Sequence, residues 1–126
     1  MLRSLIIAAA VALPGCGTEP MRKVQDFFQP TKGQAALSAG LKQYEDGEYA
    51  ASLKNLLSAI DQGLGERDRV TAHKHAAFIH CASNRERQCR DEFRKALAVD
   101  PAMDLAPAEA GHPVWGPVFR SVKAGR

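Results

Sequence analysis

The chain has 126 residues, of which 17 are Lys or Arg and 14 are Asp or Glu, so its formal net charge is +3 at pH 7. A chain of this length is expected to form one domain. The nearly balanced charge, without a stripe of basic and aromatic residues, argues against nucleic acid as a partner. Aromatic residues make up 6% of the sequence, and its frequent alanines favour helices over strands.

The N-terminus has the pattern of a bacterial export signal. Arg3 supplies a positive charge, and residues 4–13, SLIIAAAVAL, carry none. This run is too short to span a membrane, which takes about 20 residues. The alternative is a buried helix of the fold, but the run has no polar face and ends at Pro14. The sequence LPGC at residues 13–16 resembles the bacterial lipobox, in which a small residue precedes a cysteine that becomes lipidated.

The lipobox resemblance implies a covalent lipid on Cys16 and removal of residues 1–15 as a signal peptide. Acyl chains on this cysteine would anchor the protein in a membrane. Lipoprotein sorting rules imply the periplasmic face of the outer membrane of a Gram-negative bacterium, because Gly17 rather than Asp follows the cysteine. Residues 16–33 contain prolines and glycines and little periodic pattern, so we expect a lipidated N-terminus followed by a flexible tether.

Two later stretches of the chain resemble each other at an offset of 37 residues. They are GLKQYEDGEYAASLKNLLSAI at residues 40–60 and AFIHCASNRERQCRDEFRKAL at residues 77–97. Small residues align with small ones, and residues that favour turns align at Gly47 and Asn84. Internal similarity at this period predicts a helical repeat, with each copy forming a hairpin of two helices.

The repeat resembles the tetratricopeptide repeat (TPR). In the second copy, the Ala, aromatic, Ala and Pro positions of that family hold Ala77, Phe93, Ala96 and Pro101. The first copy has Ser52 where Ala is usual, and the offset exceeds the family's period of about 34 residues. The additional residues of the longer period would fit in the loop DQGLGERDR. We therefore expect an all-α domain at residues 34–124 that contains two TPR-like units.

The tail of the chain is expected to supply a capping helix, because two repeats alone leave an apolar face uncovered. Pro113 suits a first helical turn. Apolar residues follow it with helical spacing at Val114, Trp115, Val118, Phe119 and Val122.

Two cysteines remain once Cys16 is assigned to lipid. Cys81 and Cys89 would lie on neighbouring antiparallel helices, on either side of the turn at Asn84. Thiols in an oxidising compartment tend to pair, so we expect a disulfide between them. The alternative is that both are small core residues without a covalent bond.

The sequence contains no nucleophile–base pairing, phosphate-binding glycine loop or array of paired carboxylates. We therefore expect neither enzymatic activity nor a small-molecule substrate. His73 and His80 could share a helix face, but no further ligand completes a metal site at suitable spacing, so no metal is expected. The charge-rich run SNRERQCRDEFRK is typical of an exposed helix face.

The order of the segments resembles that of the TssQ family, small lipoproteins associated with type VI secretion. A lipobox and a tether precede a small repeat domain, and a Leu-x-Pro turn then leads to a helix opened by proline. The elements of this tail are Leu105, Pro107, Pro113, Trp115 and Phe119. The resemblance implies an interaction or scaffold module that binds a periplasmic component of a secretion machine.

Other functions stay open on the sequence alone. Related architectures serve as pilotins or as accessory parts of outer-membrane assembly, and a general envelope-stabilising role needs only the anchor and the fold. A thiol-redox role ranks last, because the cysteines are not in a CxxC motif. The residues that helix position marks as candidates for partner binding are Tyr44, His73, Lys74 and His80.

Overall fold

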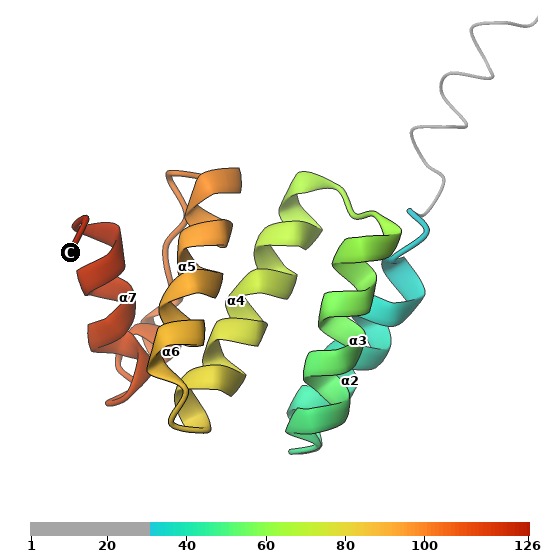
Figure 1. The fold of residues 1–126 in the computed structure, drawn as a ribbon, viewed down its shortest axis with the longest axis horizontal. Coiled ribbons are helices and arrows are strands. Elements are labelled where there is room, and N and C mark those ends of the chain that lie inside the picture. Colours follow the sequence, from blue (N-terminus) through green and yellow to red (C-terminus); the bar gives the residue numbers. More distant parts are fainter. Residues whose placement is uncertain (1–30) are drawn as a thin grey trace, which may run out of the picture.

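The computed structural model describes residues 31–126, and these residues form helices joined by short loops (Figure 1). The helices are α2 (Gln34–Glu45), α3 (Tyr49–Gln62), α4 (Glu66–Ala82), α5 (Glu86–Val99), α6 (Pro107–Ala110) and α7 (Trp115–Lys123). No strand occurs in this part of the chain, and the predicted all-α class is confirmed. The expected signal peptide, Cys16 and the tether up to residue 30 lie outside the described residues.

The helices form two antiparallel hairpins that stand side by side. The first pairs α2 with α3 and the second pairs α4 with α5, while α3 also packs on α4 (Figure 1). This arrangement confirms the predicted helical hairpin repeats. No helix among residues 31–126 is long and apolar enough to cross a membrane.

Equivalent turns close the two hairpins, as the repeat predicts. Gly47 and Asn84 both have positive φ angles, 77° and 58°. Glycine tolerates this left-handed region freely and asparagine better than most residues. The backbone N–H of the next residue in each turn, Glu48 or Arg85, donates a 2.8 Å hydrogen bond to a carbonyl near the end of the preceding helix.

The helices of the first hairpin approach closely at a small residue. The Ser52 hydroxyl donates a 2.6 Å hydrogen bond to the Gly40 carbonyl oxygen. A Cβ atom at Gly40 would lie 3.0 Å from side-chain atoms of Leu56, which is fully buried. The small residues that align in the sequence therefore occupy a tight contact between helices.

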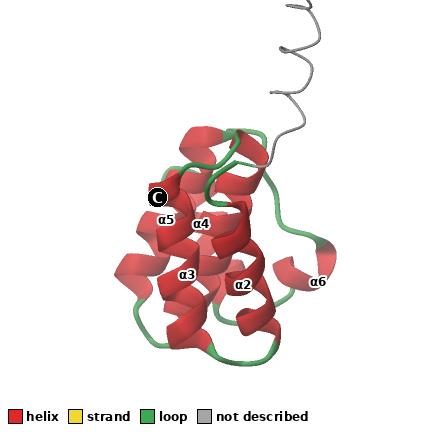
Figure 2. Cartoon of the chain, turned by 90° about the vertical axis from the view of Figure 1, so that its right-hand side faces the viewer, coloured by secondary structure: helices red, strands yellow, loops and turns green. Residues whose placement is uncertain are grey.

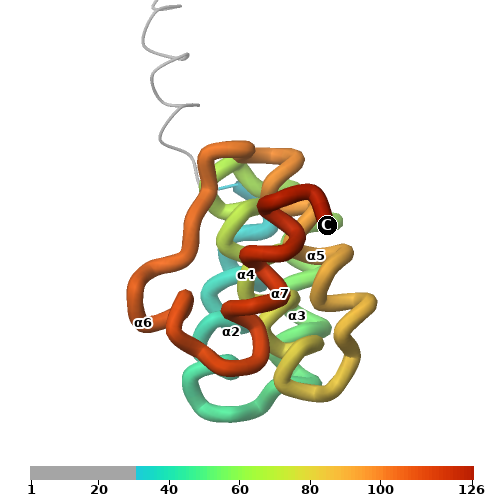
Figure 3. Tube along the Cα trace, turned by 90° about the vertical axis from the view of Figure 1, so that its left-hand side faces the viewer, coloured from blue at the N-terminus to red at the C-terminus, as the bar shows by residue number. Residues whose placement is uncertain are grey.

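The C-terminal segment covers the second hairpin. α7 packs on α5 and α4, and Figure 3 shows it lying across them. Phe119 of α7 is 2% exposed, and its ring meets that of Phe93 edge-on at a centroid distance of 5.2 Å. The predicted capping helix is therefore present, but it begins at Trp115, after Pro113 rather than at it. The short helix α6 was not predicted.

Candidate functional site

A set of aromatic side chains gathers where the two hairpins meet. Tyr44 of α2 lies 5.6 Å from Tyr49 of α3 and 5.0 Å from His75 of α4, measured between ring centroids. Phe78 of α4 lies beneath them and is fully buried. Tyr49 is 42% exposed, whereas Tyr44 and His75 are half-buried. Three helices therefore present one partly exposed aromatic surface.

Two residues that follow α6, His112 and Trp115, extend this surface. Trp115 stacks on Phe78 with a centroid distance of 4.3 Å, and His112 stacks on Trp115 at 3.4 Å. The Trp115 indole N–H donates a 2.9 Å hydrogen bond to the Glu109 carbonyl oxygen. We call Tyr44, Tyr49, His75, His112 and Trp115, together with Phe78 beneath them, the aromatic face.

An ion pair fastens α6 beside the aromatic face. The Lys74 Nζ atom lies 3.0 Å from the Glu109 Oε2 atom, and both side chains are about four-fifths buried. Glu109 also accepts a 3.0 Å hydrogen bond from the Ala106 backbone N–H at the start of α6. Figure 2 shows that α6 projects on the side of the molecule occupied by α2. One charged pair thus joins the second hairpin to the C-terminal segment.

Burial favours the neutral forms of two side chains of the aromatic face, His75 and Tyr44. Burial lowers the pKa of His75 below the ordinary value of 6.5. Its Nδ1–H donates a 2.8 Å hydrogen bond to the Thr71 carbonyl oxygen. Burial likewise raises the pKa of Tyr44 above 10.0. The neutral forms of His75 and Tyr44 are therefore favoured beside the ion pair of Lys74 and Glu109.

The structure separates the four predicted partner-binding residues into two groups. Tyr44 and Lys74 belong to the aromatic face and its border. His73 instead points into the packing between α4 and α5, where it is 9% exposed and donates a 2.6 Å hydrogen bond to Glu92. Its imidazole is consequently not available to a partner, because α5 covers it.

His80 lies on the same side of α4 as His73. Its Nδ1 atom accepts a 2.9 Å hydrogen bond from the Arg85 Nε–H. Burial and the charge of Arg85 lower the pKa of His80, while Glu92 opposes them. Burial alone would raise the pKa of Glu92, but the hydrogen bond from His73 and the charges of His73 and Lys95 lower it overall. His73 and His80 thus share the surroundings of Glu92 and lie apart from the aromatic face.

The two remaining cysteines form a disulfide. Cys81 and Cys89 are joined by an S–S bond of 2.04 Å, with their Cα atoms 5.2 Å apart. Both residues are buried, at 3% and 0% exposure. The bond links α4 to α5 across the turn at Asn84, as the sequence predicts. Among residues 31–126, no three His, Cys, Asp or Glu side chains are grouped so that they could hold a metal ion.

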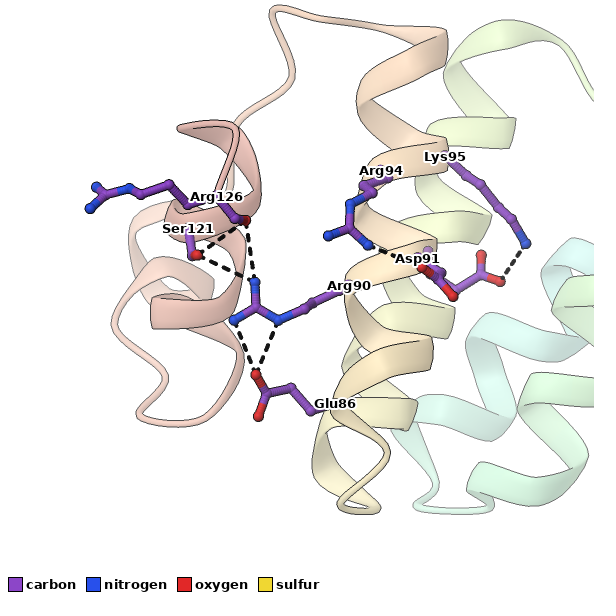
Figure 4. Close-up of polar contacts among 8 residues, drawn as sticks. Glu86, Arg90, Asp91, Arg94, Lys95, Ser121 and Arg126 are labelled. Atoms are coloured by element: carbon purple, nitrogen blue, oxygen red, sulfur yellow. Dashed lines mark hydrogen bonds and ion pairs between the residues drawn. The ribbon is translucent and has the colours of Figure 1, made fainter.

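The outer side of α5 carries a second polar cluster (Figure 4). Arg90 is paired with Glu86 at 3.0 Å and also donates to the Ser121 hydroxyl at 3.3 Å, which ties α5 to α7. Arg94 pairs with Asp91 on the same helix at 3.1 Å. Arg90 and Arg94 on this predicted exposed face thus each have a carboxylate partner on the same helix.

Comparison with known proteins supports the repeat assignment over part of the chain. The chain is 32% identical over 62 residues to Photosystem I assembly protein Ycf3 of Synechococcus sp. (strain CC9605), a TPR-containing protein. The match covers 49% of this chain and 36% of the relative, so the chain spans about a third of that relative's length. No protein-family model and no solved structure matches the chain.

The aromatic face contains residues that the sequence did not single out for binding. Tyr49 begins the second helix of its hairpin, and His75 follows the predicted Lys74 directly. A search for aromatic residues at the ends of the repeat helices could have found Tyr49. No local signal marked Glu109, because its contact with Lys74 depends on where α6 packs.

Proposed function

We propose that this chain is a protein-interaction module that binds a partner polypeptide through the aromatic face. The carrying observation is that Tyr44 and Tyr49, from different helices, lie together at the surface beside the pair of Lys74 and Glu109. Tyrosine and tryptophan are enriched where proteins bind one another, because they bury a large apolar area and keep a polar group for hydrogen bonding. The name of the relative Ycf3, an assembly protein, is in keeping with an accessory role in building a complex.

The cellular setting that we propose follows from the N-terminal pattern. The chain is an outer-membrane lipoprotein that is anchored through Cys16 and faces the periplasm, where it serves an envelope machine. The resemblance of its segment order to the TssQ family favours type VI secretion. A pilotin-like or outer-membrane assembly role is the alternative within the same setting, and a general envelope-stabilising role would not require the aromatic face.

Site-specific crosslinking in the producing bacterium tests the proposal. A photoreactive phenylalanine analogue replaces Tyr49, and crosslinked envelope proteins are identified by mass spectrometry. The matched control carries the analogue at Leu57 of α3, which is also an exposed apolar residue (38% exposed) but is not part of the aromatic face. We expect a specific product at position 49, with a secretion component as the crosslinked protein.

Two further variants test separately whether the aromatic face binds the partner and whether Cys16 anchors the protein in the membrane. Tyr44→Ala should reduce the position-49 product at least about tenfold, because removing a central aromatic anchor typically costs 2 kcal/mol or more. Cys16→Ala should leave the protein in the soluble periplasmic fraction. If positions 49 and 57 give the same products, the aromatic face is not the binding surface. If Cys16→Ala still fractionates with the outer membrane, the anchor is elsewhere.

A further inference from the structure

A cavity of about 420 Å³ lies between the segment before α7 and α7 itself. Ligand-binding pockets commonly measure about 300–1,000 Å³. The residues that line this cavity are Asp104, Leu105, Ala110, Gly116, Phe119, Arg120, Lys123 and Ala124. None of them belongs to the aromatic face, so the cavity is a separate site at the α7 end of the stack.

The cavity has an apolar floor. Leu105 and Phe119 are 8% and 2% exposed, and they belong to the same buried cluster as Phe93. Gly116 allows α6 and α7 to meet here, because a Cβ atom at this position would lie 2.4 Å from the Ala110 carbonyl oxygen. An apolar side chain that entered the cavity would therefore pack on buried hydrophobic residues and would be removed from contact with water.

Two basic side chains, Arg120 and Lys123, and one acidic side chain, Asp104, line the rim of the cavity. Arg120 donates one hydrogen bond, from NH1 to the Ala110 carbonyl oxygen at 3.2 Å. Its other guanidinium nitrogens make no hydrogen bond within residues 31–126. Lys123 donates to the Met103 carbonyl oxygen at 2.7 Å and lies 3.5 Å from Asp104. Asp104 of the lining is thus paired with Lys123, and Arg120 is the cation that remains to attract an anion into the cavity.

We propose that this cavity binds a segment of a partner polypeptide in which a bulky apolar side chain is followed directly by a carboxylate. The apolar side chain would enter between Leu105 and Phe119, and the carboxylate would meet the free guanidinium edge of Arg120. Arginine suits this role because its planar group can donate two parallel hydrogen bonds to a carboxylate. The site goes beyond the proposed function, since binding here does not involve the aromatic face.

The test uses the full chain and a fluorescein-labelled probe peptide, Gly-Ser-Gly-Ser-Phe, with a free carboxyl terminus. Fluorescence anisotropy measures its binding, and the same peptide with a C-terminal amide is the matched ligand. The free acid should bind at least about tenfold more tightly, as a charge-assisted hydrogen bond to arginine is worth about 1.5–3 kcal/mol. Equal binding of the two peptides, or binding of neither, would overturn the proposal.

Three variants locate the site, each checked for native helix content by circular dichroism. Arg120→Glu should weaken binding of the free acid at least tenfold, and Ala124→Leu should weaken it by occupying the cavity without changing charge. Arg94→Glu is the control, because Arg94 is an exposed arginine on α5 that does not line the cavity. An equal loss in Arg94→Glu and Arg120→Glu would contradict the proposal. Octanoate that binds in an Arg120-dependent way while the free acid peptide does not would instead indicate a fatty acid.

Discussion

Lys74 of α4 and Glu109 of α6 form a partly buried ion pair, with 3.0 Å between Nζ and Oε2. Glu109 is also bonded to the Ala106 backbone N–H, so one carboxylate both caps α6 and attaches it to the second hairpin. This side chain acts together with the Trp115 indole, which donates to the Glu109 carbonyl oxygen, to position the short helix beside the aromatic face.

The first prediction concerns this attachment. Glu109→Gln removes the charge that holds Lys74, so amide hydrogen exchange in residues 106–112 should accelerate. Global stability should fall by at most about 1 kcal/mol, because ion pairs with access to solvent contribute little. The control is Asp91→Asn, which breaks the exposed pair with Arg94 and should leave exchange in α6 unchanged. Unaltered exchange in Glu109→Gln would show that stacking of Trp115 holds the segment by itself.

The second prediction concerns the disulfide. Reduction of the bond between Cys81 and Cys89, which are eight residues apart, should lower the free energy of unfolding by about 2–3 kcal/mol, because the short closed loop restricts the unfolded chain. Urea denaturation with and without dithiothreitol measures the difference. The double variant Cys81→Ala/Cys89→Ala should show no response to dithiothreitol. A wild-type curve that does not move on reduction would contradict the expected contribution.

The third prediction tests the close contact in the first hairpin. Gly40→Ala places a methyl group 3.0 Å from the buried Leu56 side chain, so it should destabilise the protein by about 1–3 kcal/mol through overpacking. Ser38→Ala is the control on the exposed side of the same helix, where the change should be neutral or slightly stabilising. Thermal unfolding of both variants provides the comparison. Equal melting temperatures would mean that α2 and α3 shift apart at little cost.

The fourth prediction concerns pH. The folded state lowers the pKa of His75 by burial, so below pH 6.5 the unfolded chain takes up a proton at this position more readily than the folded protein does. Stability should therefore fall as the pH decreases from 6.5 towards 5, and His75 should contribute no pH dependence above about 7.5. Denaturation midpoints measured between pH 5 and 8 should show a shallower decline for His75→Gln than for the wild type. Parallel declines would assign the acid sensitivity to other groups.

The lowered pKa of Glu92 causes a second loss of stability, at a lower pH than the loss caused by His75. Its charged form is favoured in the folded protein by His73 and Lys95, so the stability that it contributes is lost as the pH falls through its folded pKa. The two effects occur in different pH ranges, because a carboxylate with a lowered pKa is protonated only well below the range in which imidazoles titrate.

Much of the fold could be predicted because it depends on spacing along the chain. The turns at Gly47 and Asn84, the paired small residues and the two cysteines on either side of a turn are all local relationships. A helix converts such spacings directly into shared faces. The candidate site was less predictable, since helix position alone did not show which side of α4 would be covered.

The contrast between His73 and Lys74 shows the reason. They are neighbours in the sequence, yet His73 is buried against Glu92 of α5 and Lys74 binds Glu109 of α6. Periodicity indicates that adjacent residues point in different directions, but not which element each one meets. That outcome depends on how α5 and the C-terminal segment pack around α4.

The sequence by itself determined the helical class, the two hairpins, their turn residues and the position of the cysteine pair, because these follow from local spacing and backbone preference. Only the tertiary structure decided that Trp115 stacks on Phe78 and that Glu109 reaches Lys74. Those contacts join residues more than 30 positions apart. They form only when side-chain packing brings the segment around α6 back onto α4, and no pattern within a single helix encodes that return.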